Sequence, residues 1–350
     1  MDQDCIKLTS YCSDDRSGIG ITSARETQTG LYVNGEIAAS ILLHGTDGSV
    51  LRHQLHTGPP MGDPPATAPL LDQSVNLTGS RFLTLERSRL LSDEIDPVGV
   101  RNKDGEATRL TVYLSRGDHV YQGAAFEVIC ELLHRRGIAG ATALEGVAGS
   151  LHGSDERPQL TSRHAAVPMM VVVISPGAQL GLVLPELAGL LRRPLFTLEP
   201  VHVCKRDGQL VSPPPAVPAA DDDGGQRWQK LAIYACDSAR HGGQPVHRAI
   251  IRGLRAAGIG SAVTVRGVWG FRGDSVPHGG SRHTPAVTIV TDIPERIAAA
   301  FRVVDEITAE HGLVTSNIVT GIRAKVGGTS RRHLRLRRWL LCPRRTTNAD

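Results

Sequence analysis

The alternation of apolar and polar residues predicts one series of elements in the middle of the chain. Residues 109–114, RLTVYL, alternate and are rich in β-branched and aromatic residues, which is typical of a strand. In residues 124–137, AAFEVICELLHRRG, the apolar positions recur at helical spacing up to a glycine that is typical of a helix end. The order β-α-β-β-α-β is completed by strands at 141–147 and 168–174, a helix at 178–192 and a strand at 197–203.

A second copy of this series follows at a constant offset of 121 residues. RLTVY (109–113) is answered by KLAIY (230–234), and RRGIAGATALEGVAG (135–149) by AAGIGSAVTVRGVWG (256–270). An offset without gaps indicates a duplicated structural unit. In this copy, Asp292 and Glu295 have the spacing of a capping box, with Pro294 in the first helical turn.

A third, altered copy opens the chain. Its matching pieces are KLTSY (7–11), IAASILLHGTDG (37–48) and FLTLERSRLL (82–91), the last of which answers LFTLEPVHVC (195–204). Its first helix is expected near residues 20–34, where no periodic apolar face exists. Five prolines between Pro59 and Pro69 lie where its third strand is expected to begin. We therefore expect a degraded and partly irregular first copy.

The copies define the expected domains. These are repeat one at residues 5–91, repeat two at 108–206, repeat three at 228–324, and a basic disordered tail at 325–350. The segments 92–107 and 207–227 are expected to be extended, solvated linkers. The element order predicts an α+β fold of tandem ferredoxin-like domains, each an antiparallel sheet with both helices on one face. The other face is bare and requires a partner.

Charge and cysteine content narrow the class of protein. The net charge is +4, but the last twenty residues hold seven arginines and one acid, so the remaining body is slightly acidic. We therefore expect no nucleic-acid binding by the folded body. The six cysteines have no metal-binding spacing and suit a reducing compartment. The N-terminus has no apolar core typical of a signal peptide, so a cytoplasmic protein is expected.

The order of these motifs resembles one known family. The run KLxxY, a helix ending in glycine, GIAGATxxxGxxG and TLExVxV resembles the bacterial "domain of unknown function 190" family, which is similar in fold to the nitrogen regulatory PII signalling proteins. The resemblance covers repeats two and three almost fully and repeat one in fragments. It implies trimers whose bare sheet faces meet around a threefold axis, and small effectors, often adenine nucleotides, in the clefts between subunits. Three tandem copies could form such a ring as an intrachain pseudo-trimer.

Two repeated features are candidates for ligand binding. A Gly-x-x-Gly follows each second strand, as Gly45/Gly48, Gly146/Gly149 and Gly267/Gly270. These glycines could form a backbone nest for an anion, or simply a tight turn. The second feature is a Ser-Arg-His triplet before the third strand, which contains Arg163, His164, Arg282 and His283, with Arg272 earlier in the loop of repeat three. Arginine matches phosphate or carboxylate oxygens, although a solvated surface loop is the alternative.

These observations favour a binding protein over an enzyme. The chain has no G-x-S-x-G sequence, no Walker A sequence and no metal-binding arrangement of histidines, so no metal or catalytic residue is assigned. The leading hypothesis is a PII-like signalling or adaptor protein with a small anionic effector between repeats two and three. The alternative is a ligand-free structural or protein-interaction module. The resemblance suggests a membrane transporter or fluoride channel as a partner, and a metal-assisted nucleotide hydrolase remains a third hypothesis.

Overall fold

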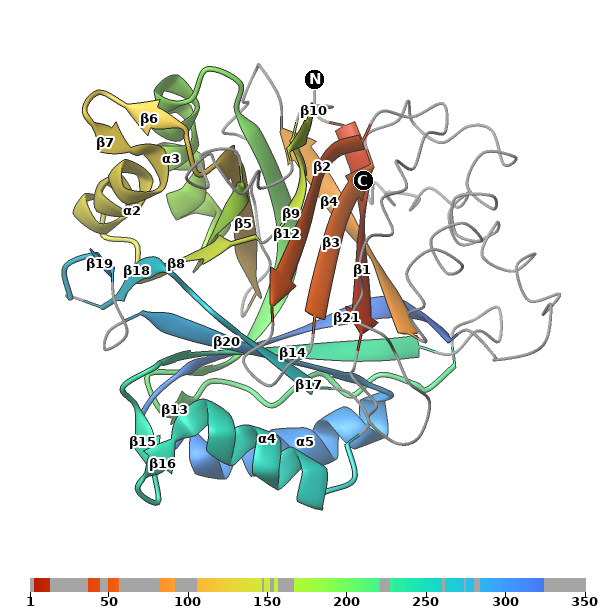
Figure 1. Ribbon diagram of the computed structural model, residues 1–350. Helices are drawn as coiled ribbons and strands as arrows, with labels where there is room; N and C mark the ends of the chain where they lie inside the picture. Colours follow the sequence, from red (N-terminus) through yellow and green to blue (C-terminus); the bar gives the residue numbers. More distant parts are fainter. Residues whose placement is uncertain are drawn as a thin grey trace, which may run out of the picture.

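The computed structural model describes residues 3–12, 37–44, 50–56, 82–91, 106–146, 148–151, 154–156, 167–220, 227–259, 262–273, 275–279 and 284–323. Within these residues the fold is mixed α/β, with one large, mostly antiparallel sheet and four helices. The helices form two layers, α2 with α3 and α4 with α5, which lie on different sides of the molecule (Figure 1). None of the described helices is long and apolar enough to span a membrane.

Repeat two contains the predicted order of elements. They are β5 (Glu106–Ser115), β6 (His119–Val120), β7 (Gly123–Ala124), α2 (Ala125–Arg135), β8 (Gly140–Glu145), β9 (Ala148–Leu151), β10 (Ser154–Glu156), β11 (Pro168–Ser175), α3 (Gly177–Leu190), β12 (Leu195–Arg206) and β13 (Gln209–Leu210). Its long strands pair antiparallel in the spatial order β12–β5–β11–β8. Leu133 of α2 and Leu184 of α3 pack in one core with Leu110 of β5, so the helices cover one face of the sheet.

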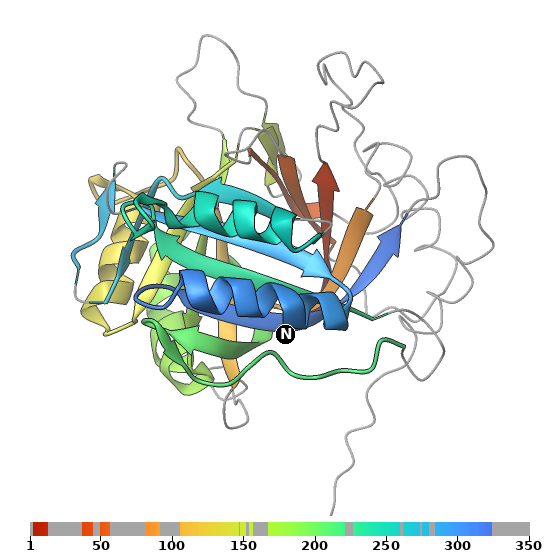
Figure 2. The ribbon, with the colours of Figure 1, turned by 90° about the horizontal axis from the view of Figure 1, so that it is seen from below.

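Repeat three has the equivalent arrangement. Its elements are β14 (Arg227–Cys236), β15 (Arg240–His241), β16 (Gln244–Pro245), α4 (Val246–Ala256), β17 (Ala262–Arg266), β18 (Trp269–Arg272), β19 (His278–Gly279), β20 (Pro285–Asp292), α5 (Pro294–Ile307) and β21 (Leu313–Arg323). The spatial order of its long strands is β21–β14–β20–β17. Figure 2 shows α4 and α5 side by side over this sheet.

The capping box predicted for α5 is wrong, although Pro294 does occupy the first turn. The N-cap residue is Ile293, and no side chain caps the helix. Asp292 is the last residue of β20 and is paired with Gln229 in the sheet. Its carboxylate accepts a hydrogen bond from the amide of Ile293 at 2.9 Å. The sheet therefore holds Asp292 one residue too early to reach the third amide of the helix.

Repeat one supplies four strands in the described part of the chain, β1 (Gln3–Cys12), β2 (Ile37–His44), β3 (Val50–His56) and β4 (Phe82–Leu91). The third strand is β3, so its expected start between Pro59 and Pro69 is wrong. The reason is that β3 follows β2 directly among the described elements, whereas β9 and β10 lie between β8 and β11 in repeat two. The expected irregular helix near 20–34 and the tail at 325–350 lie outside the described residues.

The last strands of the three repeats pair with one another in a closed cycle. The end of β4 pairs with the start of β12, the end of β12 with the start of β21, and the end of β21 with the start of β4. The contacts use equivalent positions, since Thr197 lies opposite Leu90, Thr315 opposite Val203, and Thr84 opposite Gly321. Repetition of the sequence is thus matched by a repeated contact.

The sheet faces not covered by helices are buried against one another. One apolar cluster contains Ile41 and Leu43 of repeat one, Met170 and Val172 of repeat two, and Val265 of repeat three, all buried. Removal of this apolar surface from water stabilises the association of the repeats. The sheet faces that the sequence analysis expected to be bare are therefore covered by other repeats of the same chain.

A ring of charged side chains lies buried where the repeats meet. Lys7, Arg109 and Lys230 occupy the same position in the three first strands, and Glu86 and Glu199 the same position in two last strands. Each of these five side chains is at most 6% exposed. We call these five residues and Asn317, which takes the place of a third glutamate, the central ring.

Most contacts of the central ring cross from one repeat to another. Lys7 contacts Glu199 at 3.2 Å, and Arg109 contacts both Glu199 and Glu86, the latter at 2.7 Å. Lys230 lies 2.5 Å from Glu86, and the amide of Asn317 donates to Glu86 at 3.0 Å. Breaking one buried pair would leave an uncompensated charge, which costs about 3–5 kcal/mol. The ring therefore penalises separation of the repeats.

The central ring has three cations but only two carboxylates, so it carries one excess positive charge. This excess shifts the pKa values of its members in different directions. Burial would raise the pKa of Glu86, but the charges of Lys230 and Arg109 outweigh it and hold the pKa well below its usual range. Burial would lower the pKa of Lys7, but Glu199 raises it above its usual value. By contrast, burial, assisted by the charge of Arg109, lowers the pKa of Lys230 to about 8. Lys230 is thus the cation that the ring accommodates least well.

This asymmetry predicts an unusual pH dependence of stability. Because the pKa of Lys230 is lower in the folded chain than in the unfolded chain, the unfolded chain binds more protons between about pH 8 and 10.5. The contribution of Lys230 to the free energy of unfolding should therefore rise with pH in this window. Urea denaturation at pH 7.5 and 9.5 should show this rise in the wild type, but not in Lys230→Met. Lys7→Met should retain it, and an equal rise in all three proteins would contradict the assignment.

Candidate functional site

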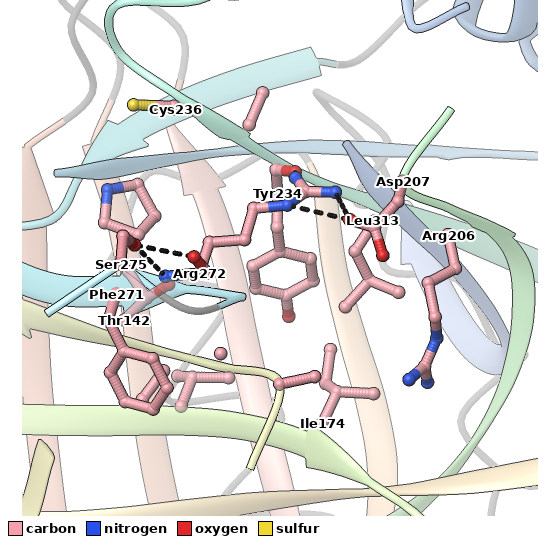
Figure 3. A pocket seen from close by; sticks show the side chains of 16 residues that line it. Thr142, Ile174, Arg206, Asp207, Tyr234, Cys236, Phe271, Arg272, Ser275 and Leu313 are labelled. Carbon is pink, nitrogen blue, oxygen red and sulfur yellow. Dashed lines mark hydrogen bonds and ion pairs between the residues drawn. The ribbon is translucent and has the colours of Figure 1, made fainter. Parts of the chain in front are cut away.

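A pocket of about 230 Å³ lies at the junction of repeats two and three (Figure 3). Most of its wall is apolar, and its charged lining residues are Arg206, Asp207 and Arg272. Repeat two contributes Ala139, Gly140, Ala141, Thr142, Val172, Ile174, Arg206 and Asp207, and repeat three contributes Tyr234, Ala235, Cys236, Phe271, Arg272, Ser275, Pro285 and Leu313. An apolar cavity with a few convergent polar groups is typical of a small-molecule site. Neither repeat forms this cavity alone.

Arg272 was predicted as a ligand-binding residue and lines the pocket. Its Nη2 and Nε groups donate to Oδ1 of Asp207 at 2.6 and 3.2 Å, and its Nη1 group donates to the backbone carbonyl of Tyr234 at 3.2 Å. The guanidinium is therefore held between the end of β12 and the end of β14. This places a fixed positive charge at the pocket wall.

Aromatic contacts hold the strand that carries Arg272. The strand β18 of repeat three pairs with β8 of repeat two, with Arg272 opposite Gly140. Trp269 packs edge-on against Phe126 of α2, with ring centroids 6.1 Å apart, and Phe271 packs edge-on against His134 at 5.1 Å. Such pairs add roughly 0.5–1.5 kcal/mol each beyond the burial of their area. Repeat three is thus anchored to repeat two beside the pocket.

Arg206 and Asp207 are lining residues that the sequence analysis missed. Asp207 was placed in a solvated linker, but it begins the two-residue turn between β12 and β13. Asp207 and Gly208 have φ values of +52° and +79°, which suit an Asp-Gly hairpin turn. An Asp-Gly pair after an apolar strand was a signal that could have located this hairpin. Among the lining residues, no hydrogen bond or ion pair engages the Arg206 side chain (Figure 3).

The repeated glycines are explained by strand packing. The amides of Gly146 and Gly267 donate to the carbonyls of Pro168 and Pro285 at 2.9 and 2.8 Å, so neither is available to an anion. Gly149 lies in β9, opposite Ile41 of repeat one. A side chain at Gly270, whose φ is +154°, would overlap the carbonyl oxygen of Ala141 at 2.4 Å. Gly45 and Gly48 lie outside the described residues.

Four predicted site residues, Arg163, His164, Arg282 and His283, lie outside the described residues. Pro285, two residues after His283, lines the pocket. Arg163 and His164 precede Pro168, which occupies the equivalent position in repeat two.

The equivalent junction between repeats one and two lacks the arginine. There β9 of repeat two pairs with β2 of repeat one, as β18 pairs with β8. Leu151 occupies the position of Arg272 and lies buried in the apolar cluster, and Ser150 occupies the position of Phe271. The two junctions thus share a backbone arrangement but differ in chemistry.

The described residues contain no group of three or more His, Cys, Asp or Glu side chains that could hold a metal ion. Cys236 lines the pocket as a partly exposed thiol, hydrogen-bonded with the Ser238 hydroxyl at 2.9 Å. By contrast, burial raises the pKa of the Cys204 thiol to about 12, and burial also raises the pKa of Cys130 far above its usual value. Cys236 therefore provides a chemical probe of the pocket.

The role of Gly270 in strand packing predicts a large effect of a single methyl group. Gly270→Ala should lower the free energy of unfolding by roughly 1–3 kcal/mol, because the new Cβ requires strained backbone and displaces β8. Gly189→Ala, on an exposed position of α3 with open space around it, should instead raise it by about 0.5–1 kcal/mol. Urea denaturation measures the free energy of unfolding of both variants. A Gly270→Ala variant that is as stable as the wild type or more stable would contradict the packing role.

Comparison with known proteins places the repeats in a family. No curated protein matches the chain significantly. The profile of the DUF190 family, described as "Uncharacterized ACR", matches residues 107–203 and 228–321, which correspond to repeats two and three. Because these two segments cover more than half of its 350 residues, the chain belongs to the DUF190 family and contains two tandem copies of its domain.

Proposed function

We propose that this chain is a PII-like sensor or adaptor that binds a small anionic effector in the pocket between repeats two and three. In this proposal each repeat is a ferredoxin-like domain of the PII type, and the three form a pseudo-trimer within one polypeptide. The cyclic pairing of β4, β12 and β21 supports the pseudo-trimer. The main observation in support of binding is that Arg206 and Arg272 line a pocket whose wall is largely apolar.

The chemistry of the pocket supports an anion with an apolar or planar body. An arginine pairs with carboxylate or phosphate oxygens through parallel hydrogen bonds, and Arg206 is not engaged by the other lining residues. Phe271, Ile174 and Leu313 offer surface to the remainder of the ligand. An adenine nucleotide combines both properties and is the effector that we propose to test first.

The position of the pocket supports a signalling role. Because residues of both repeats line it, a ligand contacts both and stabilises one relative arrangement of them. A ligand that binds one arrangement of the repeats more tightly than another shifts the population toward that arrangement. The surface around the hairpin β18–β19 would then differ between the free and bound states, which a protein partner could recognise.

One observation favours a second candidate, a ligand-free interaction module. The guanidinium of Arg272 is already paired with Asp207, so the charge at the wall is partly satisfied without a ligand. In this case the junction would serve only to join the repeats.

Thermal denaturation with nucleotides distinguishes the two candidates. ATP, ADP, AMP or cyclic AMP, present at about 100 times its dissociation constant, should stabilise the wild type by roughly 2.7 kcal/mol. Arg206→Ala and Arg272→Leu should lose this response, the latter because it copies Leu151 of the other junction. Arg302→Ala, on an exposed position of α5, is the matched control and should respond as the wild type does. No response to any nucleotide would favour the ligand-free module.

Alkylation of Cys236 tests where the ligand binds. Iodoacetamide should modify Cys236 in the free protein, because its thiol is partly exposed, and a bound nucleotide should slow the reaction. Peptide mass spectrometry measures the modified fraction, with buried Cys130 and Cys204 as unreactive internal controls. A nucleotide that raises thermal stability without protecting Cys236 binds elsewhere.

A further inference from the structure

The carboxylate of Asp207 occupies a place in the pocket where a ligand anion would bind. It accepts from two donors of Arg272, and the third contact of the guanidinium is the Tyr234 carbonyl. The Asp207 side chain is 69% exposed and that of Arg272 is 28% exposed, so the pair lies at the pocket mouth and remains accessible. A ligand that reaches Arg272 therefore meets a negative charge beside it.

The backbone fixes the position of this carboxylate. The amide of Asp207 donates to the carbonyl of Gly312 at 3.0 Å. A side chain at Gly208 would overlap the carbonyl oxygen of Ala309 at 2.4 Å, so the turn lies directly against repeat three. The Asp207 side chain can rotate, but the backbone of the turn is held in place, so the carboxylate stays near the pocket. The negative charge is thus a permanent part of the site.

The charges of the described lining residues give the pocket a small net positive charge. Arg206 and Arg272 contribute two positive charges and Asp207 one negative charge. A monoanion neutralises this set, whereas a dianion leaves one negative charge in excess and is repelled by Asp207 twice as strongly as a monoanion is. Exposure weakens this repulsion through solvent screening but does not change its sign.

We propose that Asp207 sets the charge selectivity of this pocket, so that it favours a monoanionic group over a dianionic one. This inference rests on the proposed function and adds the class of ligand to it. A carboxylate or a phosphodiester is monoanionic near neutral pH, whereas a phosphomonoester carries about 1.5 to 2 negative charges. The favoured ligand therefore carries a carboxylate or a phosphodiester rather than a phosphomonoester.

Cyclic AMP and AMP are suitable probes, because they share the base and sugar but differ in the charge of the phosphate. Calorimetric dissociation constants of both are measured for the wild type and for Asp207→Asn. Asparagine is tolerated at this turn position, so the variant should fold. A cooperative thermal denaturation of the variant is the check on its folding. Removal of the negative charge should raise the affinity for AMP roughly tenfold more than the affinity for cyclic AMP. Glu306→Gln, which removes the same charge from an exposed position of α5, should leave the ratio unchanged.

The outcomes separate this inference from the proposed function. A shift of the ratio toward AMP in Asp207→Asn alone supports the selectivity role. Binding of either nucleotide with the same ratio in all three proteins would overturn it, while the proposed binding site would stand. If neither nucleotide binds the wild type or Asp207→Asn, both the selectivity role and the nucleotide-binding function are wrong.

Discussion

The buried contacts among five charged side chains constrain the rest of this structure. Lys7, Arg109 and Lys230 reach the carboxylates of Glu86 and Glu199 mostly across the boundaries between repeats. A buried ion is tolerated only when it is paired. Because most of the partners come from different repeats, the pairs hold the repeats in one arrangement. The ring is not a strong source of net stability by itself. Its effect is that separation of the repeats at these contacts leaves a buried charge without a partner.

The cyclic pairing of the last strands and the apolar cluster work in the same direction as the ring. The pairing of β4, β12 and β21 satisfies backbone groups that would otherwise form open sheet edges. The apolar cluster supplies the hydrophobic driving force, and it draws on all three repeats. Repeat one contributes to each of these contacts through its four described strands. The altered sequence of repeat one is therefore compatible with a role in joining the other two.

The pocket follows from this assembly, since it lies where repeats two and three meet. The aromatic residues Trp269 and Phe271 fix β18 on α2, and β18 in turn presents Arg272. The junction of repeats one and two has Leu151 at that position and buries it. A duplicated backbone has thus acquired different chemistry at two equivalent places. This difference, rather than the fold, supports a binding function at one junction.

The sequence by itself determined the duplication, the order of elements in repeats two and three, and the helix faces, because hydrophobic periodicity and turn residues act locally. It also singled out Arg272, which lines the pocket. Only the tertiary structure decided that Lys7, Glu86 and Lys230 meet, since these residues are far apart along the chain. Charged residues at matching positions of apolar strands were a signal of this ring. Only the structure showed that Asp207 lies in a hairpin turn at the pocket rather than in a linker. Only the structure showed that β3 is the third strand of repeat one. Such features depend on which strands become neighbours, and long-range pairing is not encoded in any single segment.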